Sequence, residues 1–207
     1  MPVCVFGAGG HAKVVLSTLR AAGYSVEGLF DDDLRKRGSH VLGVPVLGSV
    51  AEARGRGPGQ AVLAIGDNRA RQRLATDFVG WEWVTVVHPR AYVDPSAVLG
   101  PGTVVFAGAV VQPEVRLGAH VIVNTGATVD HDCQVDDYVH LAPGVRLGGA
   151  VCVEEGALVG IGTAVIPGVR IGAWSVVGAG AVVVRDVAAG STVAGVPARA
   201  LKGRRSA

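Results

Sequence analysis

The segment VNTGATVDHDCQVDDYVHL, residues 123–141, carries an aliphatic residue at every sixth position. The same spacing holds for seventeen successive positions from Val87 to Val183, and the residue four places after each one is Ala, Thr, Val, Cys or Ser. A period of six fits neither a helix nor an ordinary strand. It is typical of a β-solenoid built from hexapeptide repeats.

Proline and glycine mark the corners of this predicted solenoid. Proline stands two places after the aliphatic residue in six repeats, and glycine often stands at the third place. Proline presets φ and glycine accepts a positive φ, so the pair suits the centre of a tight turn. Each repeat therefore predicts one short strand and one corner. The aliphatic residue and the residue four places after it are the two places of each repeat that we expect to face inward. The aromatic residues avoid both places, which predicts a narrow interior with three strands and about eighteen residues per coil.

Composition limits the classes of partner and compartment. The chain has 207 residues, enough for two small domains, and its formal net charge of +2 does not predict a nucleic-acid partner. Three cysteines without CxxC spacing, no leader segment and no long apolar run favour a cytoplasmic protein with no membrane anchor. The basic residues Lys202, Arg204 and Arg205 predict a solvated tail.

The hexapeptide register is absent before Val87, where strands and helices alternate instead. This alternation predicts a small Rossmann-like parallel sheet. We expect an α/β domain over residues 1–82, followed by an all-β solenoid domain with its tail over residues 83–207. The expected strands are Val3–Phe6, Ser25–Phe30 and Ala61–Ile65, and the expected helices are Ala12–Ala22 and a basic helix that ends near Phe78.

The stretch Gly7-Ala8-Gly9-Gly10-His11-Ala12 fits a G-x-G-x-x-A phosphate-binding turn. It follows a predicted strand, opens a predicted helix and precedes Asp31 and Asp32 by about twenty residues. Such a helix N-terminus attracts phosphate, and the acid binds ribose. About eighty residues supply only half of a dinucleotide-binding sheet, so the pattern predicts a nucleoside diphosphate. A purely structural tight turn is the alternative.

His131 is the strongest candidate for a catalytic base. It takes the corner place that proline fills in six other repeats, and Asp130 and Asp132 flank it. A neutral imidazole accepts a proton near pH 7, and a carboxylate on its other nitrogen fixes the tautomer. This arrangement suits acyl transfer to an amine or a hydroxyl, and His140, on a flat face, is a second candidate. Cys133 takes an inward place, so we do not expect a covalent route.

The other histidines do not predict a metal site. His88 and His120 occupy corner places where a solvated side chain is expected. His131 and His140 leave from different kinds of place, and no third imidazole is expected to converge with them. We therefore expect no metal.

Several motifs together resemble those of the bacterial sugar O- and N-acetyltransferases, which include the bacillosamine-pathway and perosamine N-acetyltransferases and the sialic acid O-acetyltransferases. The resemblance implies a left-handed parallel β-helix and a homotrimer with active sites between neighbouring prisms. The motifs are the glycine-rich turn, the hexapeptide repeats, Ala64-Ile65-Gly66-Asp67-Asn68, Asp130-His131-Asp132-Cys133 and Ala194-Gly195-Val196-Pro197-Ala198.

The resemblance also implies roles for individual residues. His131 is then the general base, and Asp132 raises its basicity in a place where some members carry glutamate. The co-substrate acetyl-CoA is expected at His140, Gly149, Ile161 and Ala179, the last of which departs from the glycine often found there. The nucleotide-linked sugar is expected at Gly9, Gly10, His11, Asp31, Asp32, Ile65 and Gly66.

The function expected from these features is acetyl transfer from acetyl-CoA to the amino group of a UDP- or GDP-linked amino-dideoxy sugar. His131 accepts the proton during direct attack of the amine on the thioester. O-acetylation of a sugar such as sialic acid is the alternative reaction. A nucleotide-sensing solenoid scaffold without catalysis is the non-enzyme alternative.

Overall fold

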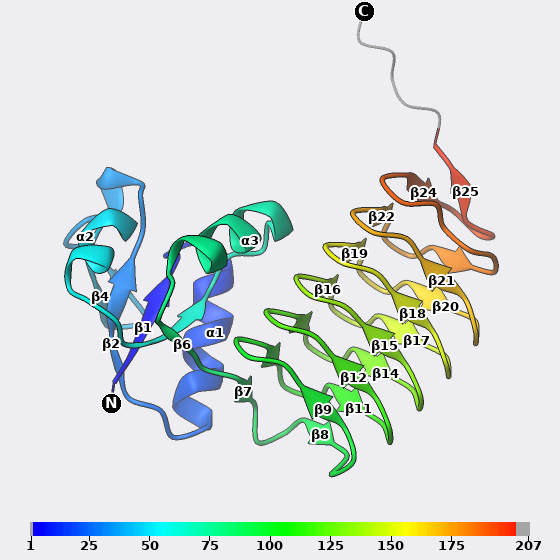
Figure 1. Ribbon diagram of the computed structural model, residues 1–207, viewed down its shortest axis with the longest axis horizontal. Helices are drawn as coiled ribbons and strands as arrows, with labels where there is room; N and C mark the ends of the chain where they lie inside the picture. Colours follow the sequence, from blue (N-terminus) through cyan, green and yellow to red (C-terminus); the bar gives the residue numbers. More distant parts are fainter. Residues whose placement is uncertain (1, 202–207) are drawn as a thin grey trace, which may run out of the picture.

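The computed structural model describes residues 2–201, which form an α/β part and a β-helix joined near β7 (Figure 1). The predicted tail with Lys202, Arg204 and Arg205 lies outside these residues. No helix in the described range is long and apolar enough to cross a membrane. The α/β part contains β1 (Val3–Phe6), α1 (Gly10–Ala21), β2 (Val26–Phe30), η1 (Leu34–Lys36), β3 (His40–Val41), β4 (Val44–Gly48), α2 (Val50–Gly55), β5 (Gln60–Leu63), α3 (Asn68–Asp77) and β6 (Glu82–Trp83).

The sheet of the α/β part is six-stranded, in the order β3-β4-β2-β1-β5-β6, and all its pairs are parallel except β3 with β4. The three predicted strands and two predicted helices are confirmed within one or two residues at their ends. The short elements between β2 and β5 were not predicted. There β4 contains Pro45, and α2 is a six-residue helix held by a capping box between Ser49 and Glu52.

The β-helix has three flat faces, and each of its strands from β7 to β23 is two residues long. The first face contains β7 (Val86–Val87), β10 (Val104–Val105), β13 (Ile122–Val123), β16 (His140–Leu141), β19 (Leu158–Val159), β22 (Val176–Val177), β24 (Thr192–Ala194) and β25 (Arg199–Ala200). The second contains β8 (Tyr92–Val93), β11 (Val110–Val111), β14 (Thr128–Val129), β17 (Arg146–Leu147), β20 (Ala164–Val165) and β23 (Val182–Val183). The third contains β9 (Val98–Leu99), β12 (Arg116–Leu117), β15 (Gln134–Val135), β18 (Cys152–Val153) and β21 (Arg170–Ile171).

The pairing confirms the predicted coil. Val104 pairs in parallel with Val86 and with Ile122, so each coil takes eighteen residues and three strands. The inward places are buried from Thr103 onward, Cys133 among them, whereas those of the first coil are half-buried. The three-sided β-helix that the repeats predict is thus confirmed, together with the left hand that the resemblance implies. The division after residue 82 stays a prediction.

The corners adopt the backbone expected from the proline and glycine pattern. Glycines at the third place have a positive φ, as in Gly102 at 71° and Gly168 at 72°. Six residues other than glycine take the same conformation in the β-helix, among them His120 at 54° and Asp132 at 59°. Aspartate is one of the side chains that tolerate this conformation best. The corner at Asp132 therefore has the same backbone conformation as the equivalent corners of other repeats.

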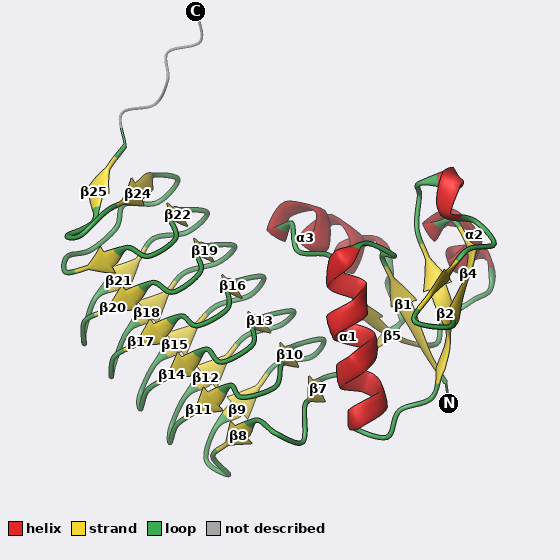
Figure 2. Ribbon diagram, turned by 180° about the vertical axis from the view of Figure 1, so that it is seen from behind, coloured by secondary structure: helices red, strands yellow, loops and turns green. Residues whose placement is uncertain are grey.

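The first face of the β-helix packs against the α/β part (Figure 2). Val104, Phe106 and Ile122 join the apolar cluster formed by α1 and the sheet. Because the α/β part also covers the edge between the third and first faces, His120 is only 3% exposed and stacks on Tyr138 at 5.4 Å. The prediction of a solvated His120 was therefore wrong.

Candidate active site

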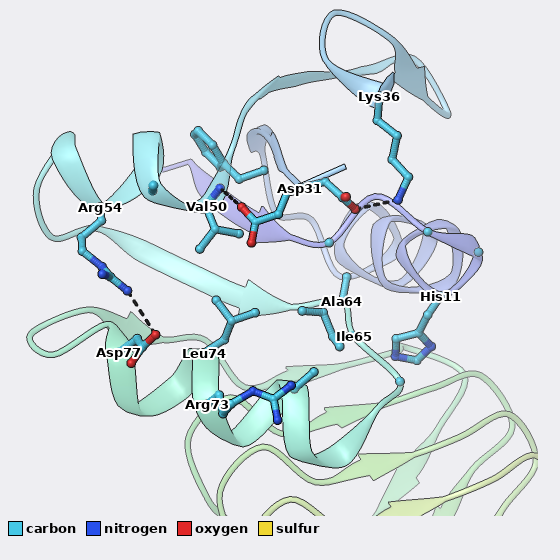
Figure 3. Close-up of a pocket in the computed structure, with 18 residues that line it drawn as sticks. His11, Asp31, Lys36, Val50, Arg54, Ala64, Ile65, Arg73, Leu74 and Asp77 are labelled. Carbon is cyan, nitrogen blue, oxygen red and sulfur yellow. Dashed lines mark hydrogen bonds and ion pairs between the residues drawn. The ribbon is translucent and has the colours of Figure 1, made fainter. Parts of the chain in front are cut away.

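A cavity of about 730 Å³ lies where β1, β2 and β5 end, at the edge where α/β folds bind ligands (Figure 3). All seven residues predicted to contact a nucleotide-linked sugar line it. The structure thus brings together segments that are about fifty residues apart in the chain. Their contact with a ligand stays a prediction. The seven residues are Gly9, Gly10, His11, Asp31, Asp32, Ile65 and Gly66.

The glycine-rich turn leaves the N-terminus of α1 open toward this cavity. Gly9 is the N-cap, so no side chain satisfies the first N–H groups of the helix, and its first turn holds no acidic residue. A Cβ atom at Gly9 or Gly10 would meet no atom within 4 Å, so the space above both is free. Gly7 is different, because its φ is 104° and a Cβ would lie 2.8 Å from the carbonyl oxygen of Ala64. The open helix end and its dipole suit a phosphate.

The two aspartates after β2 hold the cavity wall. The Asp31 carboxylate accepts hydrogen bonds from the backbone N–H of Ala8 at 2.7 Å and from Nζ of Lys36 at 2.9 Å. Burial alone would raise the pKa of Asp31, but the bonds from Lys36 and from backbone N–H groups outweigh it and lower that pKa. Asp32 accepts from the N–H of Val50, the first residue of α2, at 3.0 Å. Both carboxylates therefore support the loops around the cavity.

The sequence reasoning missed four charged residues of the cavity: Lys36, Arg54, Arg73 and Asp77. A usable signal was present in α3. Its cavity-lining residues Ala70, Arg73, Leu74 and Asp77 recur at helical spacing, whereas the other face of α3 packs on the β-helix. Reading α3 only as a basic helix concealed this division into two faces.

Arg71 links the cavity to the β-helix. This side chain is buried, and its guanidinium donates to the carbonyl oxygens of Ile65 at 3.1 Å, His120 at 2.9 Å and Tyr138 at 2.6 Å. Burial lowers the pKa of Arg71 to about 10, which leaves it charged at pH 7. Asn68 adds bonds to the carbonyl oxygens of Gly156 and Ala157. One end of the cavity is therefore fixed to the β-helix by main-chain contacts.

His11 and His140 meet where that end of the cavity reaches the first face. Their ring centroids are 6.1 Å apart, and the His11 ring also lies 5.5 Å from Phe106. Burial and the nearby charge of Arg71 lower the pKa of each histidine to about 4, so both are neutral at pH 7. Within the described residues, Nε2 of His11 is buried without a hydrogen-bond partner.

The tautomer of His140 follows from its neighbours. Oδ1 of Asn124 accepts the N–H of Thr125 at 2.8 Å, so Nδ2 of Asn124 is the group that faces Nε2 of His140 at 3.1 Å. Nε2 therefore accepts, and Nδ1 carries the hydrogen that points to the carbonyl oxygen of Gly66 at 3.4 Å. Although His140 stands on a flat face as predicted, both of its nitrogens already have partners.

His131 and Asp132 form a close pair at an exposed corner. Nδ1 of His131 lies 2.7 Å from Oδ2 of Asp132, and both side chains are 60% exposed. The hydrogen bond to Asp132, followed by the charge of Asp130, raises the pKa of His131. Because Asp132 occupies Nδ1, Nε2 is the nitrogen that can accept a proton from another molecule. The pair has the geometry of a general base with its orienting carboxylate.

Gly149 supports the ring of His131 from the next coil. A Cβ atom at this position would lie 2.6 Å from Cε1 and 2.7 Å from Nε2 of His131. Glycine is therefore what allows the imidazole to lie against the backbone there. Cys133 faces away from this corner: its Sγ donates to the carbonyl oxygen of Gly148, and burial raises its pKa to about 11. The thiol is thus unsuited to act as a nucleophile.

The structure places the predicted residues at different edges of the prism. His131 and Gly149 lie at the edge between the second and third faces, which points away from the first face and hence from the cavity of the same chain. His140 lies on the first face, and Ile161 and Ala179 lie at the edge between the first and second faces. A single chain therefore does not bring the base to the cavity, nor the four predicted acetyl-CoA contacts together.

Known proteins resemble this chain over most of its length. A family model described as the PglD N-terminal domain matches residues 2–78. The structure of PerB from Caulobacter crescentus, in complex with CoA and GDP-perosamine, is 44% identical, with a TM-score of 0.92 over 98% of both chains. The acetyltransferase domain of PglB from Neisseria gonorrhoeae FA1090, in complex with acetyl coenzyme A, is 41% identical, with a TM-score of 0.92 over 97% of this chain and 98% of that one.

One curated relative is the GDP-perosamine N-acetyltransferase of Escherichia coli O157:H7. It is 31% identical over 147 residues, which cover 68% of this chain and 66% of the relative. The chain spans no more than 66% of the length of the curated relatives that it matches.

Proposed function

Because the chain belongs to the bacterial hexapeptide-repeat sugar O- and N-acetyltransferases, we propose that it transfers acetyl from acetyl-CoA to the amino group of a nucleotide-linked amino-dideoxy sugar. The observation that carries the proposal is the His131–Asp132 pair, an exposed base on the β-helix of a chain whose α/β part holds a glycine-lined cavity. The similar PerB, which aligns over 98% of both chains, was crystallised in complex with CoA and GDP-perosamine.

The cavity residues hold the nucleotide in this proposal. The open N-terminus of α1 at Gly9 and Gly10 takes the diphosphate, and the aspartates after β2 lie where a ribose would follow. The sugar then extends past His11 toward His140 and the first face. His11 is neutral there and lines the cavity, and its ring centroid lies 6.1 Å from that of His140, so its imidazole is the side chain that the sugar would pass.

His131 provides the proton transfer. The amine nitrogen attacks the thioester carbon, the bond from that carbon to sulfur breaks, and the amine proton moves to Nε2 of His131. Asp132 stabilises the imidazolium through its 2.7 Å contact with Nδ1. The proton then passes to the leaving sulfur, so that the products are the amide and free CoA.

The placement of the base supports a shared active site. The cavity of one chain opens toward the first face, whereas His131 of the same chain lies on the opposite edge. In a cyclic homotrimer, the edge with His131 and Gly149 of one protomer meets the edge with Ile161 and Ala179 of its neighbour. Acetyl-CoA would lie between these two edges, with its thioester beside the sugar.

A thiol-release assay tests the proposal. With acetyl-CoA and a panel of UDP- and GDP-linked amino sugars, we expect free CoA to accumulate with at least one acceptor. His131→Ala should lower kcat by about 10²- to 10⁴-fold while the oligomeric state is unchanged. Free sialic acid in the same assay separates the O-acetylation alternative. The absence of thiol release with every nucleotide amino sugar would refute the proposed function.

A further inference from the structure

The cavity has two distinct ends. His11 lies at the end near the β-helix, whereas Arg54 and Asp77 lie together at the other end (Figure 3). The open N-terminus of α1 and the aspartates after β2 lie between them in the order that phosphate and ribose would take. A nucleobase would therefore extend from the ribose toward Arg54 and Asp77.

The wall between the ribose position and this far end is apolar. Phe30, Val50, Ala51 and Leu74 line it, from β2, α2 and α3. Apolar side chains on two opposed helices suit the flat faces of an aromatic base. We call the space between these side chains the base slot. Because the apolar side chains cannot hydrogen-bond the edge of a base, discrimination between bases requires the polar groups at the far end of the base slot.

Arg54 and Asp77 are those polar groups. Nη2 of Arg54 lies 3.3 Å from Oδ2 of Asp77, and the ion pair joins α2 to α3 across the far end of the base slot. The side chains are 54% and 60% exposed, so the ion pair itself adds little stability. Arg54 also lies over the ring of Phe78 at 5.1 Å, which orients its guanidinium. The pair thus presents a donor and an acceptor side by side.

We propose that Arg54 and Asp77 read the base of the nucleotide and that this base is guanine. Guanine presents the O6 acceptor beside the N1–H and N2–H donors. A guanidinium matches O6, and a carboxylate accepts both N–H groups. Uracil presents an acceptor on each side of its single N3–H, so one carboxylate oxygen would face a carbonyl oxygen. This inference rests on the proposed function and assigns the nucleotide as GDP.

Binding of free nucleotides to the full chain tests the assignment without any turnover. By titration calorimetry, GDP should bind about 10- to 100-fold more tightly than UDP. Asp77→Asn and Arg54→Gln should each remove most of that preference and leave UDP affinity nearly unchanged. Arg56→Gln is a matched control, because Arg56 forms a similarly exposed ion pair with Glu27 outside the cavity; it should keep the preference.

Equal affinity for GDP and UDP in the unsubstituted protein would overturn the assignment. So would an unchanged GDP preference in both cavity variants. Failure of the proposed function has a different signature, namely GDP binding without thiol release from acetyl-CoA when either GDP- or UDP-linked amino sugars are supplied. The two failures are therefore separable.

Discussion

Gly149→Ala should impair the catalytic base although His131 itself is not substituted. The added Cβ would lie 2.6 Å from Cε1 of His131, where ordinary contacts are 3.4–4 Å. The imidazole must therefore retreat by roughly 1 Å, and a misplacement of that size can cost about 10²-fold in rate. The backbone of Gly149 has no positive φ, so alanine is compatible with the corner. We expect kcat to fall by about this factor while the oligomer and thermal stability stay near their original values.

A double-mutant cycle with His131→Ala identifies the cause of that loss. If Gly149→Ala acts through the ring, it has no further effect on kcat once the ring is removed. A direct contact between Gly149 and acetyl-CoA would instead raise KM for acetyl-CoA in both backgrounds. The same fall in kcat with and without His131, or an unchanged kcat in the single variant, would refute the reasoning.

Three further predictions follow from buried and paired groups. Asp132 and Asp130 raise the pKa of His131, so its neutral, proton-accepting form predominates only above that raised pKa. Asp132→Asn should therefore move the acidic limb of the pH profile of kcat/KM to lower pH and lower its plateau. An acidic limb that does not move would contradict the pairing of His131 with Asp132. Burial and Arg71 lower the pKa of His120 to about 4, so the unfolded chain binds a proton that the folded chain does not, and stability falls as pH falls. This effect amounts to about 2 kcal/mol between pH 7 and 5; urea unfolding of His120→Asn should show a correspondingly weaker pH dependence, and an equal dependence would disprove the account. Arg71→Met leaves buried carbonyl oxygens without a donor and should lower the free energy of unfolding by about 3 kcal/mol. Arg69→Met is the control, because Arg69 is exposed on the same helix and should tolerate the change. Similar losses for both variants would contradict the role of Arg71 in joining the α/β part to the β-helix.

Local patterns in the sequence were sufficient for most of the fold. The six-residue period placed the β-helix strands because each strand and corner is set within one repeat and its neighbours above and below. The glycine-rich turn could be placed because the positive φ of Gly7, 104°, is a requirement of the turn itself. The Asp132 partner of His131 was also predictable, since both residues share one corner.

Contacts between the two parts of the chain could not be predicted in this way. His120 and Arg71 are buried only because the α/β part covers one edge of the β-helix, and no repeat position records which edge is covered. Arg54 and Asp77 come from different helices, one of which was not predicted. The separation of His131 from the cavity depends on the three-sided geometry of the whole prism.

Mixing of two inactive variants tests the central claim, that the base of one chain serves the cavity of another. Gly10→Asp places a carboxylate in open space at the N-terminus of α1 and should block nucleotide binding, while His131→Ala lacks the base. In the proposed homotrimer, equal co-assembly of the two should restore about a quarter of the sites, since a working site needs an intact cavity beside an intact histidine. Activity no higher than that of the separate variants, with mixed oligomers verified by mass spectrometry, would contradict the shared site.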